Sequence, residues 1–234
     1  MSSFEASCRR SRRDSPPPPL RSVVVFTLAV LVLTTTGCSL GVMAGKMLFG
    51  NPKLSPEFYL ATGVDLVESE QTVVVIARVP SYISGDLATL EPDLINGVTD
   101  RLIRESIDAT SSEEVIDWID ERGSSDDVAA AAEKFGTDFV IRIDLSTFEN
   151  LEQKSAWLHR GRSAGTISAY KVETIDGKKV PRMVFERGFD ERHPRRQPVP
   201  VGDVSRTVFV RRHLDQLTAD IARKFHAHLP GAGI

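Results

Sequence analysis

The feature that most limits the fold of this chain is an unbroken apolar run from Val23 to Leu33. An arginine-rich start precedes the run, and small residues follow it up to Cys38. A basic start, a short apolar run and a small-residue exit are typical of a secretory signal peptide. We therefore expect residues 1–37 to be a signal peptide, with residues 1–22 as its basic region and 23–33 as its apolar core.

The end of this segment resembles the lipobox of bacterial lipoproteins, in which signal peptidase II cuts before a cysteine that carries the lipid. Gly37 and Ser39 beside Cys38 fit that pattern, whereas Thr35 departs from it, since the family usually has leucine there. The resemblance implies cleavage between Gly37 and Cys38 and a lipid such as palmitate on Cys38. Because the arginines stay in the cytoplasm, the domain is expected to face the periplasm or exterior of a bacterial envelope.

An uncleaved transmembrane helix is the alternative for the same segment. Residues 22–45 contain no charged residue, and about 20 apolar residues suffice to span a bilayer. The second half of this range is rich in Thr, Gly and Ser, which fill hydrocarbon poorly. Either anchor tethers the domain to a membrane, and the mass of the mature chain distinguishes them.

Composition narrows the class of protein further. The leader holds five of the 29 basic and two of the 32 acidic residues, which leaves 24 basic and 30 acidic residues and a net charge of −6. Nucleic-acid-binding domains normally show a basic excess, so we expect no nucleic-acid partner. The cysteines are Cys8 in the leader and Cys38 at the proposed lipid site, so no disulfide or thiol chemistry is expected in the domain.

The mature chain is long enough for one domain with a hydrophobic core. We expect residues 38–70 to form a lipid-anchored tether that packs partly on the domain, since Phe58 and its neighbours are too apolar for a free linker. The single globular domain is expected over 71–229, and residues 230–234 form a tail.

The first half of the domain predicts one buried strand followed by helices. The β-branched run at 72–79 is typical of a strand buried on both faces. A loop is expected over 81–88 and a helix over 91–105, with apolar residues at helical spacing. Gly97 within this helix indicates close packing on a sheet.

Shorter elements follow before the second strand of the sheet. Residues 106–110 predict a short strand. Ser111 and Glu114 have the spacing of a capping box for a helix that Gly123 ends. A further short helix is expected over 128–135.

The second half predicts a three-strand antiparallel meander and a final helix. Alternation over 138–149 indicates a half-exposed strand. Strands at 161–174 and 180–190 flank the turn signal Asp176-Gly177. In the last strand, Met183 and Phe185 are expected on one face.

A proline-rich connector over 193–202 is expected to be irregular, and the chain should close on a long helix over 204–228. Its predicted buried stripe consists of Leu214, Leu217, Ile221 and Phe225.

This order predicts an α/β (α+β) fold: a mixed sheet with a C-terminal meander, helices mainly on one face, and a long C-terminal helix. The order resembles the small α/β domains of the curli secretion lipoprotein, the TolB N-terminal domain and lipoprotein activators of peptidoglycan synthases. The stretches GVMAGKMLFGNPK and FERGFDERHP resemble uncharacterised lipoproteins of planctomycete-type bacteria. These resemblances imply a location and a fold and carry no catalytic residues.

Arginines near the ends of the two long strands are the most specific candidate site. If the hairpin forms, they lie side by side and offer a patch for an anionic partner, a lipid headgroup or a cell-wall polymer. The alternative is a solvated strand end with ion pairs to Glu186, Asp190 and Glu191. The candidate patch consists of Arg160, Arg162, Arg187, Arg192, Arg195 and Arg196.

Other candidate residues indicate no catalytic, metal or cofactor site. His226 and His228 do not share a helix face, and His213 lies on another face. The pair at the end of the helix is better explained as basic residues that complement a helix C-terminus. No zinc-ligand spacing, phosphate loop or nucleophile elbow occurs. The carboxylates considered for acid–base chemistry, without a partner at known distance, are Asp144, Glu149 and Glu152.

The anchor and the lack of catalytic motifs favour a non-enzymatic envelope lipoprotein that binds another envelope protein as an assembly or regulatory factor. The first alternative is a structural component that associates with itself as a homo-oligomer. The second is an envelope hydrolase, which would need a deep pocket with convergent acidic or histidine groups.

Overall fold

The computed structural model describes residues 53–85, 87–122 and 127–230. The chain divides into two compact units, Met1–Pro52 and Lys53–Ile234, and the description concerns the second. The predicted signal peptide, Cys38 and the alternative span at 22–45 lie outside the described residues. Among the described helices, none has the length and apolar character needed to cross a membrane.

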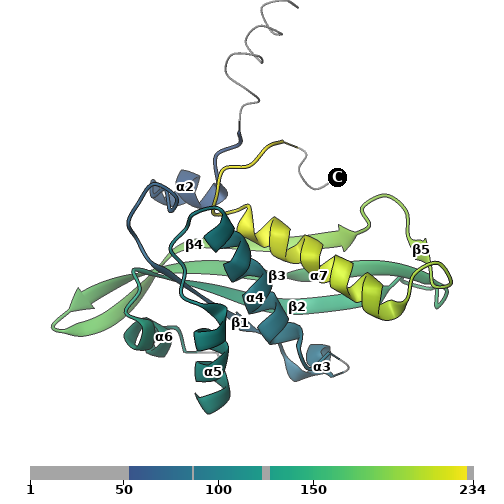
Figure 1. Cartoon of the computed structure of the whole chain (residues 1–234), viewed down its shortest axis with the longest axis horizontal. Coiled ribbons are helices and arrows are strands. Elements are labelled where there is room, and N and C mark those ends of the chain that lie inside the picture. The colour runs from purple at the N-terminus through teal and green to yellow at the C-terminus, as the bar shows by residue number, and fades with distance from the viewer. Residues whose placement is uncertain (1–52, 86, 123–126, 231–234) are drawn as a thin grey trace, which may run out of the picture. The chain divides into compact units, whose positions relative to one another are not determined.

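One mixed sheet forms the framework of the described domain (Figure 1). Strand β1 (Val73–Arg78) pairs in parallel with β2 (Phe139–Leu151). The antiparallel meander continues through β3 (Leu158–Ile175) and β4 (Lys178–His193). A short strand, β5 (Val199–Pro200), pairs with the start of β3. The predicted mixed sheet with its C-terminal meander is confirmed.

The strands follow the sequence patterns that predicted them. Five of the six residues of β1 are buried, as expected for a strand covered on both faces. The hairpin between β3 and β4 turns at Asp176 and Gly177, whose φ angles are 51° and 77°. Two successive positive φ angles are those of the tight turn that an Asp-Gly pair favours.

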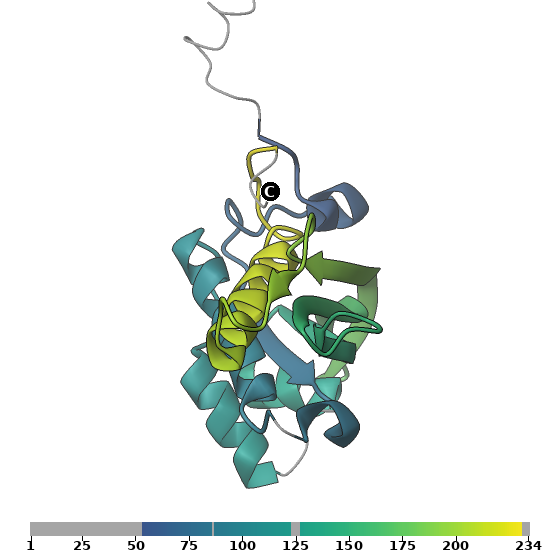
Figure 2. The ribbon, with the colours of Figure 1, turned by 90° about the vertical axis from the view of Figure 1, so that its right-hand side faces the viewer.

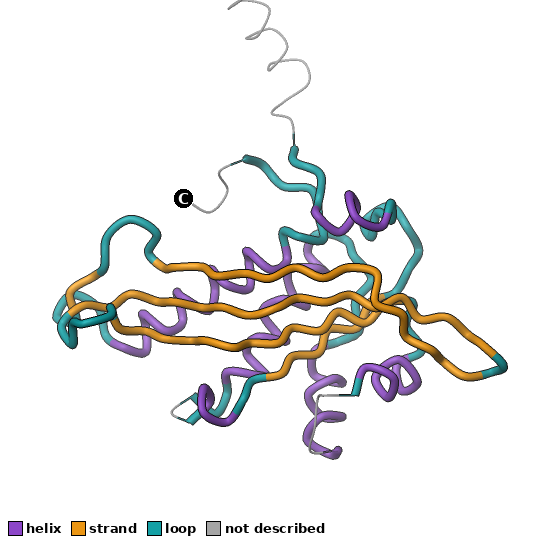
Figure 3. Tube along the Cα trace, turned by 180° about the vertical axis from the view of Figure 1, so that it is seen from behind, coloured by secondary structure: helices purple, strands orange, loops and turns teal. Residues whose placement is uncertain are grey.

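Helices cover mainly one face of the sheet, which confirms the predicted fold class. Figure 1 shows α4 (Leu90–Arg104), α5 (Ser112–Arg122) and α7 (Arg206–Ala222) in front of the strands. Figure 2 shows these helices to one side of the strands, and the strands lie in front of them in Figure 3. Helix α6 spans Val128–Phe135, as predicted, from an Asp127 cap to the left-handed Gly136.

Gly97 allows two helices to approach, rather than a helix and the sheet. A Cβ atom at this position would lie 2.7 Å from Cγ2 of Thr218 on α7. The predicted close packing is therefore present, but its partner is wrong, because α7 lies beside α4 on the same face of the sheet.

Three local predictions are corrected. The expected loop at 81–88 contains the short helix α3 (Ser81–Ser84). The expected strand at 106–110 is only a bridge between Ala109 and Val73. The connector at 193–202 contains β5. The Ala109 bridge and β5 are short elements, for which tertiary pairing outweighs local sequence preference.

Met183 and Phe185 lie on opposite faces of β4, not on one face. Phe185 is opposite Ala169, and Met183 is opposite the next residue, Tyr170, so Val184 forms a bulge. One extra residue in a strand reverses the alternation beyond it. Phe185 is consequently buried while Met183 is exposed.

The C-terminal helix is shorter than the predicted 204–228. Helix α7 ends at Ala222, and the chain continues through turns to a bridge between His228 and Leu54. Phe225 is buried, as the stripe predicted, although it lies beyond the helix. Periodic apolar residues indicated burial here, and the helix end was set by tertiary contacts.

Part of the segment assigned to the tether packs into the domain. Helix α2 (Glu57–Thr62) places Phe58 against an aromatic cluster, with ring centroids 5.4 Å from Phe139 and 5.5 Å from Phe225. Leu66 is also buried. The compact unit therefore extends back to Lys53.

Candidate functional site

The sheet divides the predicted arginine patch between its two faces. Arg162 on β3 is directly opposite Arg192 on β4, and directly opposite residues share a face. The next pair, Gly161 and His193, faces α7, because a Cβ at Gly161 would lie 2.5 Å from the His213 ring. Arg162 and Arg192 therefore lie on the face away from α7.

Arg160 belongs to the same group, two residues before Arg162 on β3. Its guanidinium lies 2.8 Å from the Glu152 carboxylate and donates to the carbonyl of Arg196. Arg162 donates to both oxygens of Asp190, at 3.2 and 2.9 Å. These hydrogen bonds hold the pKa of the Asp190 carboxyl below its ordinary value and raise the pKa of Arg162.

Arg187 and Arg195 lie away from this group. Nε of Arg187 lies 2.7 Å from a carboxylate oxygen of Glu57 on α2. Nη2 of Arg195 lies 3.4 Å from a carboxylate oxygen of Glu191 and 3.4 Å from a carboxylate oxygen of Asp220 on α7. The structure thus brings Arg160, Arg162 and Arg192 together and uses Arg187 and Arg195 in contacts between elements. The sixth predicted residue, Arg196, contributes its backbone carbonyl as an acceptor for Arg160.

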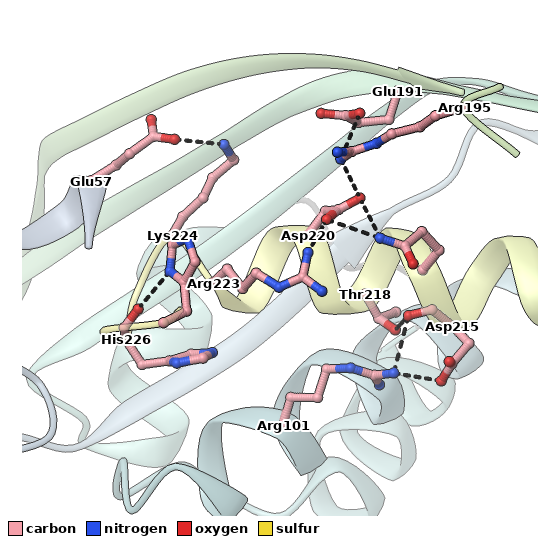
Figure 4. A network of polar contacts seen from close by, with 12 residues as sticks. Glu57, Arg101, Glu191, Arg195, Asp215, Thr218, Asp220, Arg223, Lys224 and His226 are labelled. Carbon is pink, nitrogen blue, oxygen red and sulfur yellow. Dashed lines mark hydrogen bonds and ion pairs between the residues drawn. The ribbon is translucent and has the colours of Figure 1, made fainter. Parts of the chain in front are cut away.

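Asp220 is the centre of a polar network on α7 (Figure 4). Its carboxylate accepts from Arg195, from Arg223 and from Nε2 of Gln216, which is 3.1 Å away. The side chain is largely buried, so these donors replace lost water contacts. Arg195, which follows the end of β4, therefore links this part of the chain to α7 through its ion pair with Asp220.

A layer of histidine and phenylalanine rings lies between α7 and the end of the sheet. His213 stacks on Phe148 with ring centroids 4.4 Å apart, and His159 stacks on Phe209 at 4.7 Å. The ring centroids of His193 and His213 are 6.1 Å apart. Phe209 and His213 lie four residues apart on α7, but the other members come from three strands, and no sequence pattern joins them to α7.

Asn150 connects the two buried histidines of this layer. Nδ1 of His213 donates to the Asn150 side-chain oxygen at 2.9 Å, and Nδ1 of His159 donates to its carbonyl at 3.3 Å. The Nε2 atoms of His159 and His213 have no partner within the described residues. Burial, and secondarily His193, lowers the pKa of His213 to about 3.

The histidine layer predicts acid sensitivity of the fold. His213 binds a proton in the unfolded chain below its ordinary pKa of 6.5, but in the folded chain only near 3. Stability is therefore complete above pH 6.5 and falls as the pH drops toward 3, by about 2 kcal/mol at pH 5 from this residue. Denaturant unfolding at pH 7.5 and 5.0 measures the loss.

The variant His213→Gln should lose this part of the pH dependence, whereas His228→Gln, outside the layer, should keep it. Burial also lowers the pKa of His193 and of His226, so some dependence in the same direction should persist. An unchanged pH dependence in His213→Gln would contradict the assignment.

The other candidate histidines and carboxylates do not converge. His226 and His228 are separate from His213, and no group of three potential metal ligands occurs among the described residues. Asp144 pairs with Arg142 at 2.8 Å, and Glu152 pairs with Arg160. Glu149, opposite Arg162, lines the pocket described next.

A pocket opens at the end of the sheet where β2 extends beyond β1. The pairing of β1 ends at Arg78 opposite Asp144, whereas β2 continues to Leu151. Helix α3 and the following segment lie beside the uncovered part and leave a cavity of about 870 Å³. Its lining is Tyr82, Ile83, Gly85, Leu87, Phe148, Glu149, Asn150, Leu151, Gln153, His159 and Arg206.

Exposed apolar side chains gather at the same end of the domain. Trp157, in the turn between β2 and β3, is 80% exposed. Leu151 lies at the other end of this turn, and Val201 donates its backbone N–H to the Trp157 carbonyl at 3.0 Å. Leu151 and Val201 are also exposed, and together these three residues form the tip surface. The sequence contains one signal for this surface, which is a tryptophan in an otherwise polar stretch between two strands.

Comparisons with known proteins identify no family. A scan against family models finds no match, and a search of curated proteins finds none. Among solved structures, the lipoprotein GNA1162 from Neisseria meningitidis is 12% identical with a TM-score of 0.35, covering 65% of this chain and 98% of that chain. The minor lipoprotein from Acinetobacter baumannii is 13% identical with a TM-score of 0.29, covering 67% and 91%.

The PelC dodecamer from Paraburkholderia phytofirmans is 7% identical with a TM-score of 0.36, covering 74% of this chain and 94% of that chain. Two of these three solved structures are thus bacterial lipoproteins by their names. At TM-scores below 0.5 these likenesses assign neither a family nor a site to the chain.

Proposed function

We propose that this chain is a membrane-anchored envelope lipoprotein whose domain binds another envelope protein and carries no catalytic activity. The observation that carries the proposal is the tip surface, where Trp157 is 80% exposed beside Leu151 and Val201. A grouped set of exposed apolar side chains marks an interaction surface, and tryptophan is enriched among residues that dominate binding.

Anchoring through lipid on Cys38 is the second part of this proposal. It is supported by the arginine-rich start, the apolar run and the small residues before the cysteine. Mass spectrometry of the mature chain should find residues 1–37 removed and a lipid on Cys38. A mature species that still carries Met1 would instead establish an uncleaved anchor.

Trp157→Ala should weaken partner capture without unfolding the domain. Truncating a central interface tryptophan typically costs about 2 kcal/mol or more, which is about thirtyfold in affinity. The partner recovered by pull-down after crosslinking in native membranes should fall accordingly. Stability should change by less than about 0.5 kcal/mol, because the side chain is exposed.

Met183→Ala is the matched control, because Met183 is an exposed apolar side chain on β4. It should leave partner recovery unchanged. Equal recovery from the Trp157→Ala and Met183→Ala chains would remove the tip surface from the proposal.

Self-association is the second candidate function, and the long edge strand favours it. Among the described residues, β4 is hydrogen-bonded to a strand only on its β3 side. An exposed strand edge can pair with another chain. Crosslinks from the protein only to its own copies would favour this function.

The group formed by Arg160, Arg162 and Arg192 remains a proposed contact for an anionic headgroup or polymer. Positive charge at one end of a strand pair can bind an anionic partner. The carboxylates of Asp190 and Glu152 neutralise part of this positive charge. Serine at all three positions should reduce retention on anionic membranes, and unchanged retention would exclude the contact.

A further inference from the structure

The hairpin between β3 and β4 extends beyond the rest of the sheet. The pairing of β2 with β3 begins at Phe139 and Lys171, whereas β3 and β4 remain paired up to Ile175 and Lys178. Figure 3 shows this end of the hairpin projecting past the other strands. Residues 171–182 form the projection and are called the arm.

One face of the arm carries three cations. Directly opposite residues share a face, as do alternate residues of a strand, so Lys171, Arg182 and Lys178 lie on the same side. All three are exposed, and none has an ion-pair partner within the described residues, unlike Arg162 further back on β3. Glu173 is the one carboxylate among the described residues of this face, so three cations and one anion leave a net charge of +2.

Exposed aliphatic side chains lie among these cations. Ile175 is opposite Lys178, and Val180 is opposite Glu173, so both belong to the same face. Ile175 is 51% exposed and Val180 is 39% exposed. Lysine at a free strand edge prevents pairing with other chains, but that role does not require exposed apolar side chains beside it. Cations together with exposed aliphatic side chains are the combination with which basic amphipathic segments bind anionic membranes.

We propose that this face of the arm binds an anionic lipid surface and thereby sets how the domain lies at the membrane. The three cations attract the headgroups, while Ile175 and Val180 enter the boundary between headgroups and acyl chains. The chain that remains after removal of residues 1–37 has a net charge of −6. An anionic surface therefore favours contact through this basic face over contact through the acidic surface of the domain.

The arm is separate from the surfaces described above. Lys171 follows Arg162 on β3 by nine residues, which is about 30 Å at the rise of a strand. The tip surface lies further along, since Trp157 precedes β3. The inference goes beyond the protein-binding function, and it rests on that proposal only for the anchor, which keeps the arm near a membrane.

Fluorescence quenching of the full chain reconstituted into vesicles tests the contact. A fluorescent amino acid replaces Ile175, and the quencher is a nitroxide near the headgroup end of the lipid acyl chain. The vesicles consist of phosphatidylcholine alone or of an equal mixture with phosphatidylglycerol. The probe should be quenched in the mixed vesicles only, and about 1 M salt, where the Debye length is about 3 Å, should remove the quenching. The same probe in place of Tyr82, which is 77% exposed on α3, should stay unquenched.

Serine at Lys171, Lys178 and Arg182 together should lower the ratio of bound to free arm in the mixed vesicles by about a hundredfold. Quenching of the probe at position 175 should then fall to its level in the neutral vesicles. The fold should be retained, because the three side chains are exposed and lack ion-pair partners within the described residues.

Serine at Arg104, Arg211 and Arg212 is the matched control. It removes the same charge from exposed side chains on α4 and α7 and should leave the quenching unchanged. Three results would overturn the arm contact: no quenching in the mixed vesicles, equal quenching in both kinds of vesicle, or equal loss of quenching in the control chain.

Failure of the arm contact is distinguishable from failure of the proposed function. Flotation with the neutral vesicles reports the anchor alone, because the arm should not bind them. The arm variant should keep its recovery of the protein partner, whereas Trp157→Ala should lose the partner and keep the quenching.

Discussion

Phe58→Ala should lower the free energy of unfolding by about 4 kcal/mol, the largest single effect expected in the domain. Phe58 is 1% exposed, and its ring lies 5.4–5.8 Å from those of Phe139, Phe185 and Phe225. Truncation removes these edge and tilted contacts and leaves a cavity that the surrounding rings fill only partly. Denaturant unfolding of the full chain, followed by far-UV circular dichroism, measures the loss.

Tyr59→Ala is the matched control on the same helix. Tyr59 is exposed, so its truncation should cost less than about 1 kcal/mol. Similar small losses for both variants would mean that residues 53–70 form a tether outside the cooperative domain. A large loss for Phe58 alone makes α2 part of the fold.

Gly161→Val should destabilise the chain by about 3 kcal/mol, because the added side chain meets the buried His213 ring. A Cβ at Gly161 would lie 2.5 Å from Cγ and Nδ1 of that ring. His213 is fixed by its stack on Phe148 and its bond to Asn150, so α7 must move. Thermal and denaturant unfolding should both show the loss.

Gly188→Val on β4 controls for the change from glycine to a β-branched residue. A Cβ there meets only the Gly165 carbonyl, at 3.9 Å, so the fold should tolerate it. Adding His213→Ala to Gly161→Val should recover part of the loss, because it vacates the contested space. Equal stability of the Gly161→Val and Gly188→Val chains would contradict the close contact with α7.

Local signals in the sequence predicted the elements that local interactions define. Helix α6 begins and ends where its Asp127 cap and left-handed Gly136 place it. The hairpin turn forms at Asp176-Gly177 because that pair tolerates positive φ. The apolar run at 72–79 and the alternation after 138 predicted β1 and β2, the two strands that pair in parallel.

Features that depend on distant contacts were not readable in the sequence. The bulge at Val184, the pairing of β5 and the end of α7 each require a partner from elsewhere in the chain. The last helix was predicted to reach residue 228, because its apolar spacing continues to Phe225 and indicates burial rather than backbone conformation.

The candidate site shows the same division between features that local signals predict and features that depend on distant contacts. Arg162 and Arg192 lie side by side, as strand pairing predicted. The placement of Arg187 on the opposite face from Arg192 follows from strand alternation, a signal that the sequence contained and the prediction did not use. In the histidine layer, only Phe209 and His213 are related by helical spacing, and no sequence pattern joins them to the residues from the three strands.

Site-specific photocrosslinking in native membranes tests the central claim most directly. A photoreactive residue replaces Val201 of the tip surface in one chain and the exposed Met183 in another, so that Trp157 is kept in both. Protein binding through the tip surface predicts one dominant crosslink to a different envelope protein from position 201, and none from position 183. Crosslinks to that protein from both positions alike, or from neither, would contradict it.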